Sequence, residues 1–162
     1  MKTIRKAMVL TAAVLLVVSM LAPASLAAVE STTPYVVVVS TTLYETASTS
    51  YPIMPLPKGE TVQSTETTWA YNSNWKAITY GSHSGYTQNN KIVPKAACYR
   101  VSTSSYLYVG AGTGGYAYSS PLPVGTYLYR ITSSGSYYKV RAYIGGSTYI
   151  GYILKAAVTL YQ

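Results

Sequence analysis

An internal repeat constrains the fold of this chain more than any other feature of its sequence. The segment PLPKGETV at residues 55–62 recurs 66 positions later as PLPVGTYL at residues 121–128. On either side of it, Leu43-Tyr44 matches Leu107-Tyr108, and Gly85-Tyr86 matches Gly151-Tyr152, in the same order. Repeated segments in one order indicate two copies of one structural unit. The sequence therefore predicts two modules of the same architecture.

Two further matches define the limits of the modules. Trp75–Tyr80 aligns with Tyr138–Tyr143, and Lys95–Cys98 aligns with Lys155–Val158. The spacing between copies varies from one match to the next, which places insertions and deletions between strands, where loops tolerate them. We therefore predict a first module at residues 28–97 and a second at residues 98–162.

Short strands joined by turns are expected within each module. Ser, Thr, Val, Tyr and Gly dominate both copies, a composition that favours strands over helices. The predicted strands of the first module are 35–41, 60–64, 75–80 and 84–87, and those of the second are 99–104, 126–132, 137–143 and 148–153. A long irregular loop follows each opening strand, and a turn through Lys-Ala-Ala closes each copy. The prediction is an all-β fold of two tandem, small, partly open β-barrels.

The N-terminal segment has the three parts of a signal peptide. Three basic residues within the first six positions precede an uncharged apolar run at residues 7–21, and the small residues Ser25 and Ala27 follow a proline. We expect a signal helix at residues 1–27, cleavage after Ala27, and a secreted product without a stable membrane span that is released or held at the cell wall. An uncleaved anchor is the alternative, because residues 7–29 carry no charge and a spanning helix needs about 20 apolar residues.

Charge is distributed unevenly along the mature chain. Beyond residue 27, nine Lys and Arg residues face four Glu residues, and all four Glu precede residue 67. Five basic residues after residue 98 therefore have no acidic counterpart in the second module. Such a surface attracts anionic wall polymers or peptidoglycan carboxylates in a salt-dependent way. A solvated surface that keeps the protein soluble is the alternative.

The residue types that carry catalysis or bind metals are scarce. His83 is the only histidine, Cys98 is the only cysteine, and Asp is absent. A Cys-His nucleophile would lack an orienting acid, a glycosidase needs two carboxylates at its bond, and a zinc site would lack ligands. We therefore expect no enzymatic activity, no cofactor and no metal. Because Cys98 aligns with Val158, we interpret it as a small buried hydrophobic residue, with pairing between chains as the alternative.

Several short motifs resemble those of the bacterial Src-homology-3-like (SH3-like) domain family. They are LYVGAG at 107–112, the Lys58-Gly59 turn, Trp75–Ile78, and the Gly85-Tyr86 and Gly151-Tyr152 pairs. The chain departs from the family where Tyr44 and Tyr108 replace an Asn and Tyr138 replaces a strand Trp. The resemblance implies SH3-like barrels that recognise a cell-wall peptide or glycan.

Aromatic side chains are the candidate ligand-binding groups. Phe is absent and Tyr occurs 19 times, so Tyr and Trp must build both the core and any aromatic surface. Aromatic rings stack on sugar faces or line a peptide groove, and Arg binds carboxylates. The candidates beside the long early loops are Tyr44, Trp69, Trp75, Tyr80, Tyr108, Tyr116, Tyr137, Arg141 and Tyr143. For each Tyr, packing in the core is the alternative.

Together these patterns predict a non-catalytic binding protein that recognises peptidoglycan or an associated anionic wall polymer. Two linked copies would raise avidity on a repetitive polymer. An extracellular protein-interaction or adhesion module is the alternative, because Tyr and Ser also form adaptable protein-binding faces. Nucleic acid is not an expected partner of an exported chain, although a basic aromatic barrel suits it chemically.

Overall fold

The computed structural model describes residues 31–66, 68, 69, 71, 75–112 and 114–162. The expected signal segment at 1–27 lies outside these residues. The described residues form strands, 3-10 turns and connecting loops, which confirms the all-β prediction. No helix among them is long and apolar enough to cross a membrane.

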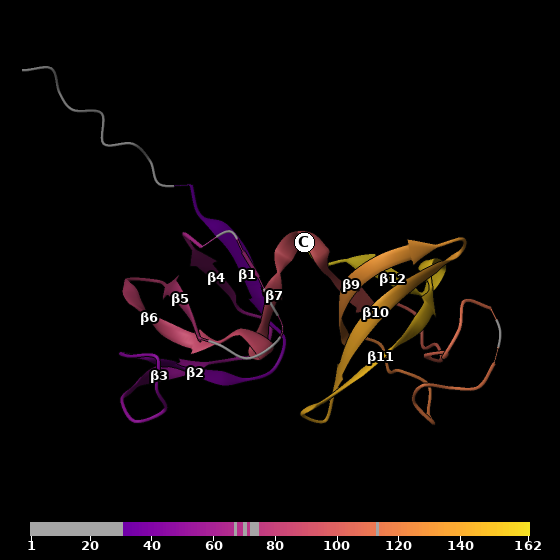
Figure 1. The fold of residues 1–162 in the computed structure, drawn as a ribbon, viewed down its shortest axis with the longest axis horizontal. Helices are drawn as coiled ribbons and strands as arrows, with labels where there is room; N and C mark the ends of the chain where they lie inside the picture. The colour runs from indigo at the N-terminus through magenta and orange to yellow at the C-terminus, as the bar shows by residue number, and fades with distance from the viewer. Residues whose placement is uncertain (1–30, 67, 70, 72–74, 113) are drawn as a thin grey trace, which may run out of the picture. The chain divides into compact units, whose positions relative to one another are not determined.

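Strands β1 to β7 form the first antiparallel sheet (Figure 1). Their bounds are Thr33–Val37, Thr41–Tyr44, Pro52–Leu56, Thr61–Ser64, Trp75–Tyr80, His83–Gln88 and Ile92–Pro94. The order across the sheet is β3-β2-β6-β5-β4-β1-β7, so the last strand returns beside the first. A 3-10 turn at Asn89–Lys91 separates β6 from β7.

Strands β8 to β12 form the second antiparallel sheet. Their bounds are Cys98–Val101, Tyr127–Ser134, Tyr137–Ile144, Ser147–Leu154 and Val158–Leu160. The order is β11-β10-β9-β8-β12, so this sheet also closes with its last strand beside its first. The 3-10 turn Lys95–Ala97 connects the two sheets, and Lys155–Ala157 precedes β12. The chain thus contains two small β domains in tandem.

The repeated Pro-Leu-Pro-x-Gly segment has the same role in both domains. Gly59 N donates to Val37 O at 2.8 Å, and Gly125 N donates to Val101 O at the same distance. Both glycines have a positive φ, 99° and 88°, which side-chain-bearing residues rarely adopt. The segment therefore turns the chain back onto the opening strand, and the repetition of this glycine follows from the turn.

Equivalent apolar positions fill the two cores. In the first domain they are Leu43, Leu56, Val62 and Ile78, and in the second Leu107, Leu122, Leu128 and Val140, all at most 3% exposed. These residues alternate with more exposed neighbours along their strands, as period-2 patterning requires. Each core is therefore built by the repeat itself.

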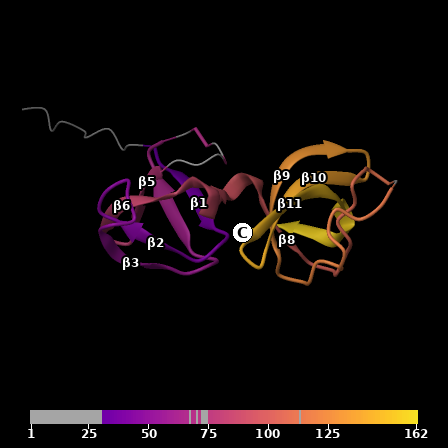
Figure 2. The same ribbon diagram turned by 60° about the horizontal axis from the view of Figure 1, so that its bottom comes forward.

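The early loops of the two domains differ. In the first domain this segment forms a hairpin of β2 and β3, with Leu43 opposite Met54, instead of the predicted irregular loop (Figure 2). In the second domain only isolated bridges occur, such as Ser105 with Leu122 and Tyr108 with Tyr116. The second copy carries four glycines between residues 110 and 115, which disfavour continuous strand pairing.

Strand pairing corrects one of the repeat alignments by one residue. Trp75 lies opposite Gln88, and Tyr137 lies opposite Leu154. Gln88 and Leu154 each stand three residues after the repeated Gly of their strand. Trp75 therefore corresponds to Tyr137, not to Tyr138. Sequence matching could not separate them, because both are Tyr.

A second predicted match is also wrong. Val158 begins β12 opposite Val101, as Ile92 begins β7 opposite Val37. The Lys-Ala-Ala turn before β12 therefore corresponds to Asn89–Lys91, whereas Lys95–Ala97 leads into β8. Cys98 is the first residue of an opening strand and has no equivalence with Val158. It is nevertheless fully buried, as predicted.

A third buried cluster joins residues from both domains. Val36, Val38 and Val93 pack in it with Cys98, Tyr127 and Tyr143. The Tyr161 hydroxyl also donates to Gly59 O at 2.7 Å, across 102 residues of sequence. The outward faces of β1 and β10 are thus partly covered, and this cluster is what removes several aromatic residues from solvent.

Candidate functional site

Two aromatic pairs occupy equivalent positions in the two domains. The rings of Tyr44 and Trp75 lie 5.3 Å apart at 86°, and those of Tyr108 and Tyr137 lie 6.2 Å apart, also at 86°. All four residues are partly exposed. The structure therefore brings together four of the nine predicted ligand-binding residues, two in each domain.

The backbone explains why each pair forms. Tyr44 lies opposite Tyr86 of β6, and Tyr86 lies opposite Ala77 of β5. Because side chains alternate along β5, Trp75 and Ala77 share the outer face while Lys76 and Ile78 are buried. In the second domain, Tyr108 and Tyr152 exchange two backbone hydrogen bonds of 2.8 and 2.7 Å.

The repeated glycine of β6 and β11 permits this close approach. A Cβ at Gly85 would collide with Tyr44 O, and one at Gly151 would lie 2.6 Å from Tyr108 O. The early segment can therefore cross the sheet only where a side chain is absent. This contact places Tyr44 and Tyr108 beside the rings of the central strands.

The second pair extends into a larger aromatic surface. Tyr116 stacks on Tyr106 with centroids 4.2 Å apart and lies 5.7 Å from Tyr108. Its side chain is 54% exposed, so the predicted residue Tyr116 does lie on an accessible surface. Sequence analysis missed Tyr106, although its two-residue spacing from Tyr108 around the buried Leu107 was a usable signal. We call Tyr106, Tyr108, Tyr116 and Tyr137 the second platform, and Tyr44 with Trp75 the first platform.

A basic side chain lies near the second platform. Lys139 Nζ is 5.9 Å from the ring centroid of Tyr152, the backbone partner of Tyr108. Lys139 stands on β10 opposite Tyr152. An anionic group bound over this platform would therefore meet a nearby ammonium group.

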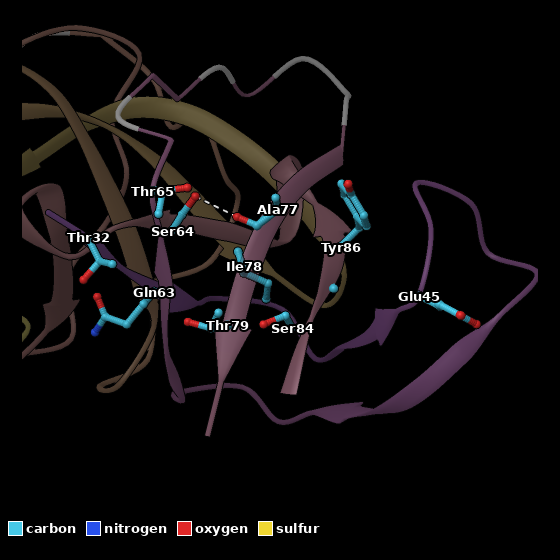
Figure 3. Close-up of a pocket in the computed structure, with 11 residues that line it drawn as sticks. Thr32, Glu45, Gln63, Ser64, Thr65, Ala77, Ile78, Thr79, Ser84 and Tyr86 are labelled. Carbon is cyan, nitrogen blue, oxygen red and sulfur yellow. Dashed lines mark hydrogen bonds between the residues drawn. The ribbon is translucent and has the colours of Figure 1, made fainter. Parts of the chain in front are cut away.

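A pocket opens in the first domain, and Figure 3 shows the residues that line it. It has a volume of about 350 Å³ and is lined by residues of β4, β5 and β6 and their neighbours: Thr32, Glu45, Gln63, Ser64, Thr65, Ala77, Ile78, Thr79, Ser84, Gly85 and Tyr86. We call it the β4–β5 pocket. Tyr86 belongs to its wall and also pairs with Tyr44, so the pocket adjoins the first platform.

The β4–β5 pocket arises because β4 is short. Only Gln63 and Thr79 are paired between β4 and β5, and the Ser64 hydroxyl donates to Ala77 O at 2.7 Å where the strands separate. The sequence did not single out these residues. Hydroxyl-bearing residues occur along every strand of this chain, so composition gave no reason to choose Thr79 or Ser84.

Trp69 and Arg141 do not line an open groove, contrary to the prediction. Trp69 Nε1 donates to Ile92 O at 3.0 Å, and the Trp69 ring lies 4.4 Å from that of Tyr129. The Arg141 guanidinium lies 3.5 Å from the ring centroid of Tyr71. Both side chains are therefore used in contacts between the two domains.

Tyr143 is buried and does not face a groove, contrary to the prediction, whereas Tyr80 is partly exposed. Tyr143 is 3% exposed in the shared cluster, and burial raises the pKa of its phenol. Tyr80 packs against the core of the first domain, and desolvation followed by a hydrogen bond with Glu60 raises its pKa. Because Phe is absent, Tyr143 fills a buried position, in line with the alternative interpretation of packing in the core.

The environment of Cys98 does not suit a nucleophile. Cys98 is fully buried, and this burial raises the pKa of its thiol to about 12. The reactive form of a cysteine is its thiolate, which this environment suppresses at neutral pH. Among the described residues, no group of three His, Cys, Asp or Glu side chains could hold a metal ion.

Comparisons with known proteins give no family assignment. No protein-family model matches the chain, and no curated protein matches it. Among solved structures, NlpC2 from Trichomonas vaginalis is 14% identical with a TM-score of 0.35, and the match covers 80% of this chain and 48% of that one. NlpC1 from the same organism is 14% identical with a TM-score of 0.36, over 82% and 47%. The chain spans about half the length of these proteins, and similarity at this level carries no argument about function.

Proposed function

We propose that this chain is an exported, non-catalytic binding protein whose two SH3-like modules recognise cell-wall peptidoglycan or an associated anionic polymer. The observation that carries the proposal is the aromatic pair that recurs at one position in both domains. The first platform uses a Trp where the second uses a Tyr, yet both pairs keep the same perpendicular arrangement.

The exposure of the platforms supports binding rather than packing alone. Tyr116 is 54% exposed, and Tyr44, Trp75, Tyr108 and Tyr137 are partly exposed, whereas the eight equivalent core positions of the two domains are at most 3% exposed. Aromatic rings on a surface bind apolar sugar faces and extended peptides, with the phenol tip available for hydrogen bonds. A glycan carrying short peptides offers both partners.

Charge supports an anionic polymer. The second domain contains five basic residues and no acidic residue, and Lys139 lies near the second platform. Two platforms on one chain also match a repetitive polymer, because the second contact becomes intramolecular once the first has formed. The second domain should therefore contribute more of the salt-dependent affinity.

The test is retention of residues 28–162 on insoluble peptidoglycan, with and without teichoic acid, across a salt series. Replacing both rings of one platform, Tyr44→Ala with Trp75→Ala or Tyr108→Ala with Tyr137→Ala, should weaken retention about tenfold, equivalent to roughly 1.4 kcal/mol. Tyr51→Ala is the matched control, because Tyr51 is 60% exposed and lies outside both platforms.

Combining the four platform substitutions should abolish retention. Unchanged retention of the fourfold variant would contradict the proposal. Strong salt sensitivity of the parent would assign the affinity to an anionic polymer, and weak sensitivity would assign it to stacking or peptide contacts.

A protein partner is the second candidate function, and the β4–β5 pocket favours it. The pocket is a concave, partly apolar site lined by residues of the first domain, whereas the platforms occur in both domains. Saturable binding to one extracellular protein, with no retention on wall polymer, would support this alternative.

A further inference from the structure

The β4–β5 pocket has a structural counterpart in the second domain. Gln63 on β4 lies opposite Thr79 on β5, and Tyr129 on β9 lies opposite Arg141 on β10. Gln63 follows Val62, which pairs with Tyr35 of the opening strand β1. In the same way, Tyr129 follows Leu128, which pairs with Tyr99 of the opening strand β8. The two pairs therefore occupy the same place on the two sheets.

In the second domain this place is covered by an aromatic segment of the same chain. The Trp69 ring packs on Tyr129 at 4.4 Å, and the Tyr71 ring lies 3.5 Å from the Arg141 guanidinium. Tyr71 and Thr148 also share a hydrogen bond of 2.8 Å between their side-chain oxygens. Trp69 and Tyr71, which lie between β4 and β5 in the sequence, thus bind to the second domain through their aromatic rings.

In the first domain the same place is the open β4–β5 pocket. The second domain has no equivalent segment to offer, because β9 ends at Ser134 and β10 begins at Tyr137. Two residues cannot present an aromatic side chain to another sheet. The face of the second domain with Tyr129 and Arg141 is therefore covered by side chains of the same chain. The equivalent face of the first domain, with Gln63 and Thr79, remains accessible.

We propose that the β4–β5 pocket is a docking site for an aromatic side chain, Tyr or Trp, carried on an extended segment of a partner protein. The proposal is independent of the wall-binding function, because none of the platform residues lines the pocket. A volume of about 350 Å³ lies at the lower end of the range for ligand sites, roughly 300–1,000 Å³. That size suits one large side chain rather than several units of a polymer.

The lining matches an amphipathic ring. Ala77, Ile78 and Tyr86 provide apolar surface, and Gln63 and Ser84 can hydrogen-bond a phenol hydroxyl or an indole N–H. The Ser64 hydroxyl is already used in its bond to Ala77 O. Glu45 is the only charged residue of the lining, so a partner with Lys or Arg next to its aromatic residue is favoured.

The first test uses a synthetic peptide with the sequence of residues 65–74, TETTWAYNSN, because it contains Trp69 and Tyr71, which contact the equivalent face. We expect its addition to isotope-labelled 28–162 to shift the backbone amide resonances of Gln63, Thr79, Ser84 and Tyr86. A peptide in which Ala replaces both aromatic residues should produce no shifts there. Shifts confined to Tyr129 and Arg141, or equal shifts with the Ala peptide, would overturn the proposal.

The second test introduces the ring-binding residues of the second domain into the pocket of the first domain. Gln63→Tyr combined with Thr79→Arg recreates the Tyr129 and Arg141 pair, and should raise the affinity for the peptide about tenfold through ring stacking and a cation–π contact. Ser84→Trp should fill the pocket and abolish binding. Thr132→Trp is the control, because Thr132 is exposed on β9 of the other domain. Unchanged affinity in both pocket variants would contradict the assignment.

Two other occupants are tested with the same resonances. Shifts at Gln63 and Thr79 that depend on the concentration of the chain itself would assign the pocket to a second copy and overturn the proposal. Shifts at these residues with an N-acetylglucosamine oligomer, but not with the peptide, would make it a sugar site and would also overturn it.

Discussion

Different residues of the two copies pack against the Tyr side chain of the opening strand. Lys76 is fully buried above the Tyr35 ring and donates to Glu66 O, Thr68 O and the Glu66 carboxylate. Its counterpart in the second domain is Tyr138, whose ring packs on Tyr99 at 5.2 Å. A cation is retained there as well, because Arg130 donates to the Tyr99 hydroxyl at 3.0 Å. Both copies therefore place a basic group beside the opening-strand Tyr, from different strands.

Burial of the Cys98 thiol predicts a loss of stability at alkaline pH. Its pKa rises from 9.0 to about 12 in the folded chain, so the folded state holds a proton that the unfolded state releases. The contribution of the protonated thiol to the unfolding free energy is fully present below pH 9 and is lost as the pH rises towards 12. The unfolding free energy should fall by at most about 1.4 kcal/mol per pH unit in this range. Urea unfolding between pH 7 and 11 measures it.

Cys98→Ala should reduce the decrease of the unfolding free energy with rising pH, but should not abolish it. Tyr127 and Tyr143 pack in the same cluster with raised pKa values, and Arg100 acts in the opposite direction on Cys98. The native thiol should also fail to react with a thiol reagent at pH 8, and react fully after unfolding. Rapid reaction in the native state would contradict the buried position.

Among the elements, the crossing of the early segment over β6 and β11 is the step that forms each platform. Gly85→Ala and Gly151→Ala place a Cβ against the backbone oxygen of Tyr44 or Tyr108, which cannot move without breaking the crossing. We expect each to cost about 1–3 kcal/mol of unfolding free energy by overpacking. The near-ultraviolet circular dichroism of the aromatic pair should weaken in parallel.

Gly115→Ala is the control for these variants. A Cβ at Gly115 meets no atom within 4 Å, so its unfolding free energy should stay within about 0.5 kcal/mol of the parent. If Gly85→Ala proved equally neutral, the close approach of β2 to β6 would be contradicted. The unfolding free energy of each variant thus reports the stability of the crossing, and its near-ultraviolet circular dichroism reports the aromatic pair.

On the scale of the whole molecule, the shared cluster predicts that the two domains unfold as one unit. Val36 and Val93 of the first domain and Tyr127 and Tyr143 of the second bury each other, so neither domain keeps its covered face without the other. Denaturation followed by Trp fluorescence and by far-ultraviolet circular dichroism should give coincident transitions. Two separate transitions would show that the domains are energetically independent.

Tyr143→Ala tests the same coupling more directly. Removing this buried ring should cost about 3–5 kcal/mol and shift both transitions together, although Tyr143 lies on β10 alone. Tyr149→Ala is a control in the next strand, because Tyr149 packs against the core of the second domain and on Tyr118. A shift confined to one probe would contradict a common transition.

The sequence alone determined the features that local patterns encode. Two copies, an all-β fold and the glycine turns before β4 and β9 all follow from spacing and residue type. The burial of Cys98 is also as predicted, but the alignment with Val158 on which that prediction rested is wrong. Five of the aromatic candidates beside the early loops also lie at least partly in solvent: Tyr44, Trp75, Tyr108, Tyr116 and Tyr137.

The tertiary structure alone decided which outward side chains stay in solvent. Trp69 and Tyr143 are aromatic like the platform residues, and Arg141 is a basic residue of an outward strand face, yet contacts between the domains bury Tyr143 and partly cover the other two. The register that equates Trp75 with Tyr137, and the gap between β4 and β5 that forms a pocket, depend on strands brought together from distant parts of the chain. Period-2 patterning specifies two faces of a strand, but the surface that meets an outward face is set by non-local packing, which no short segment encodes.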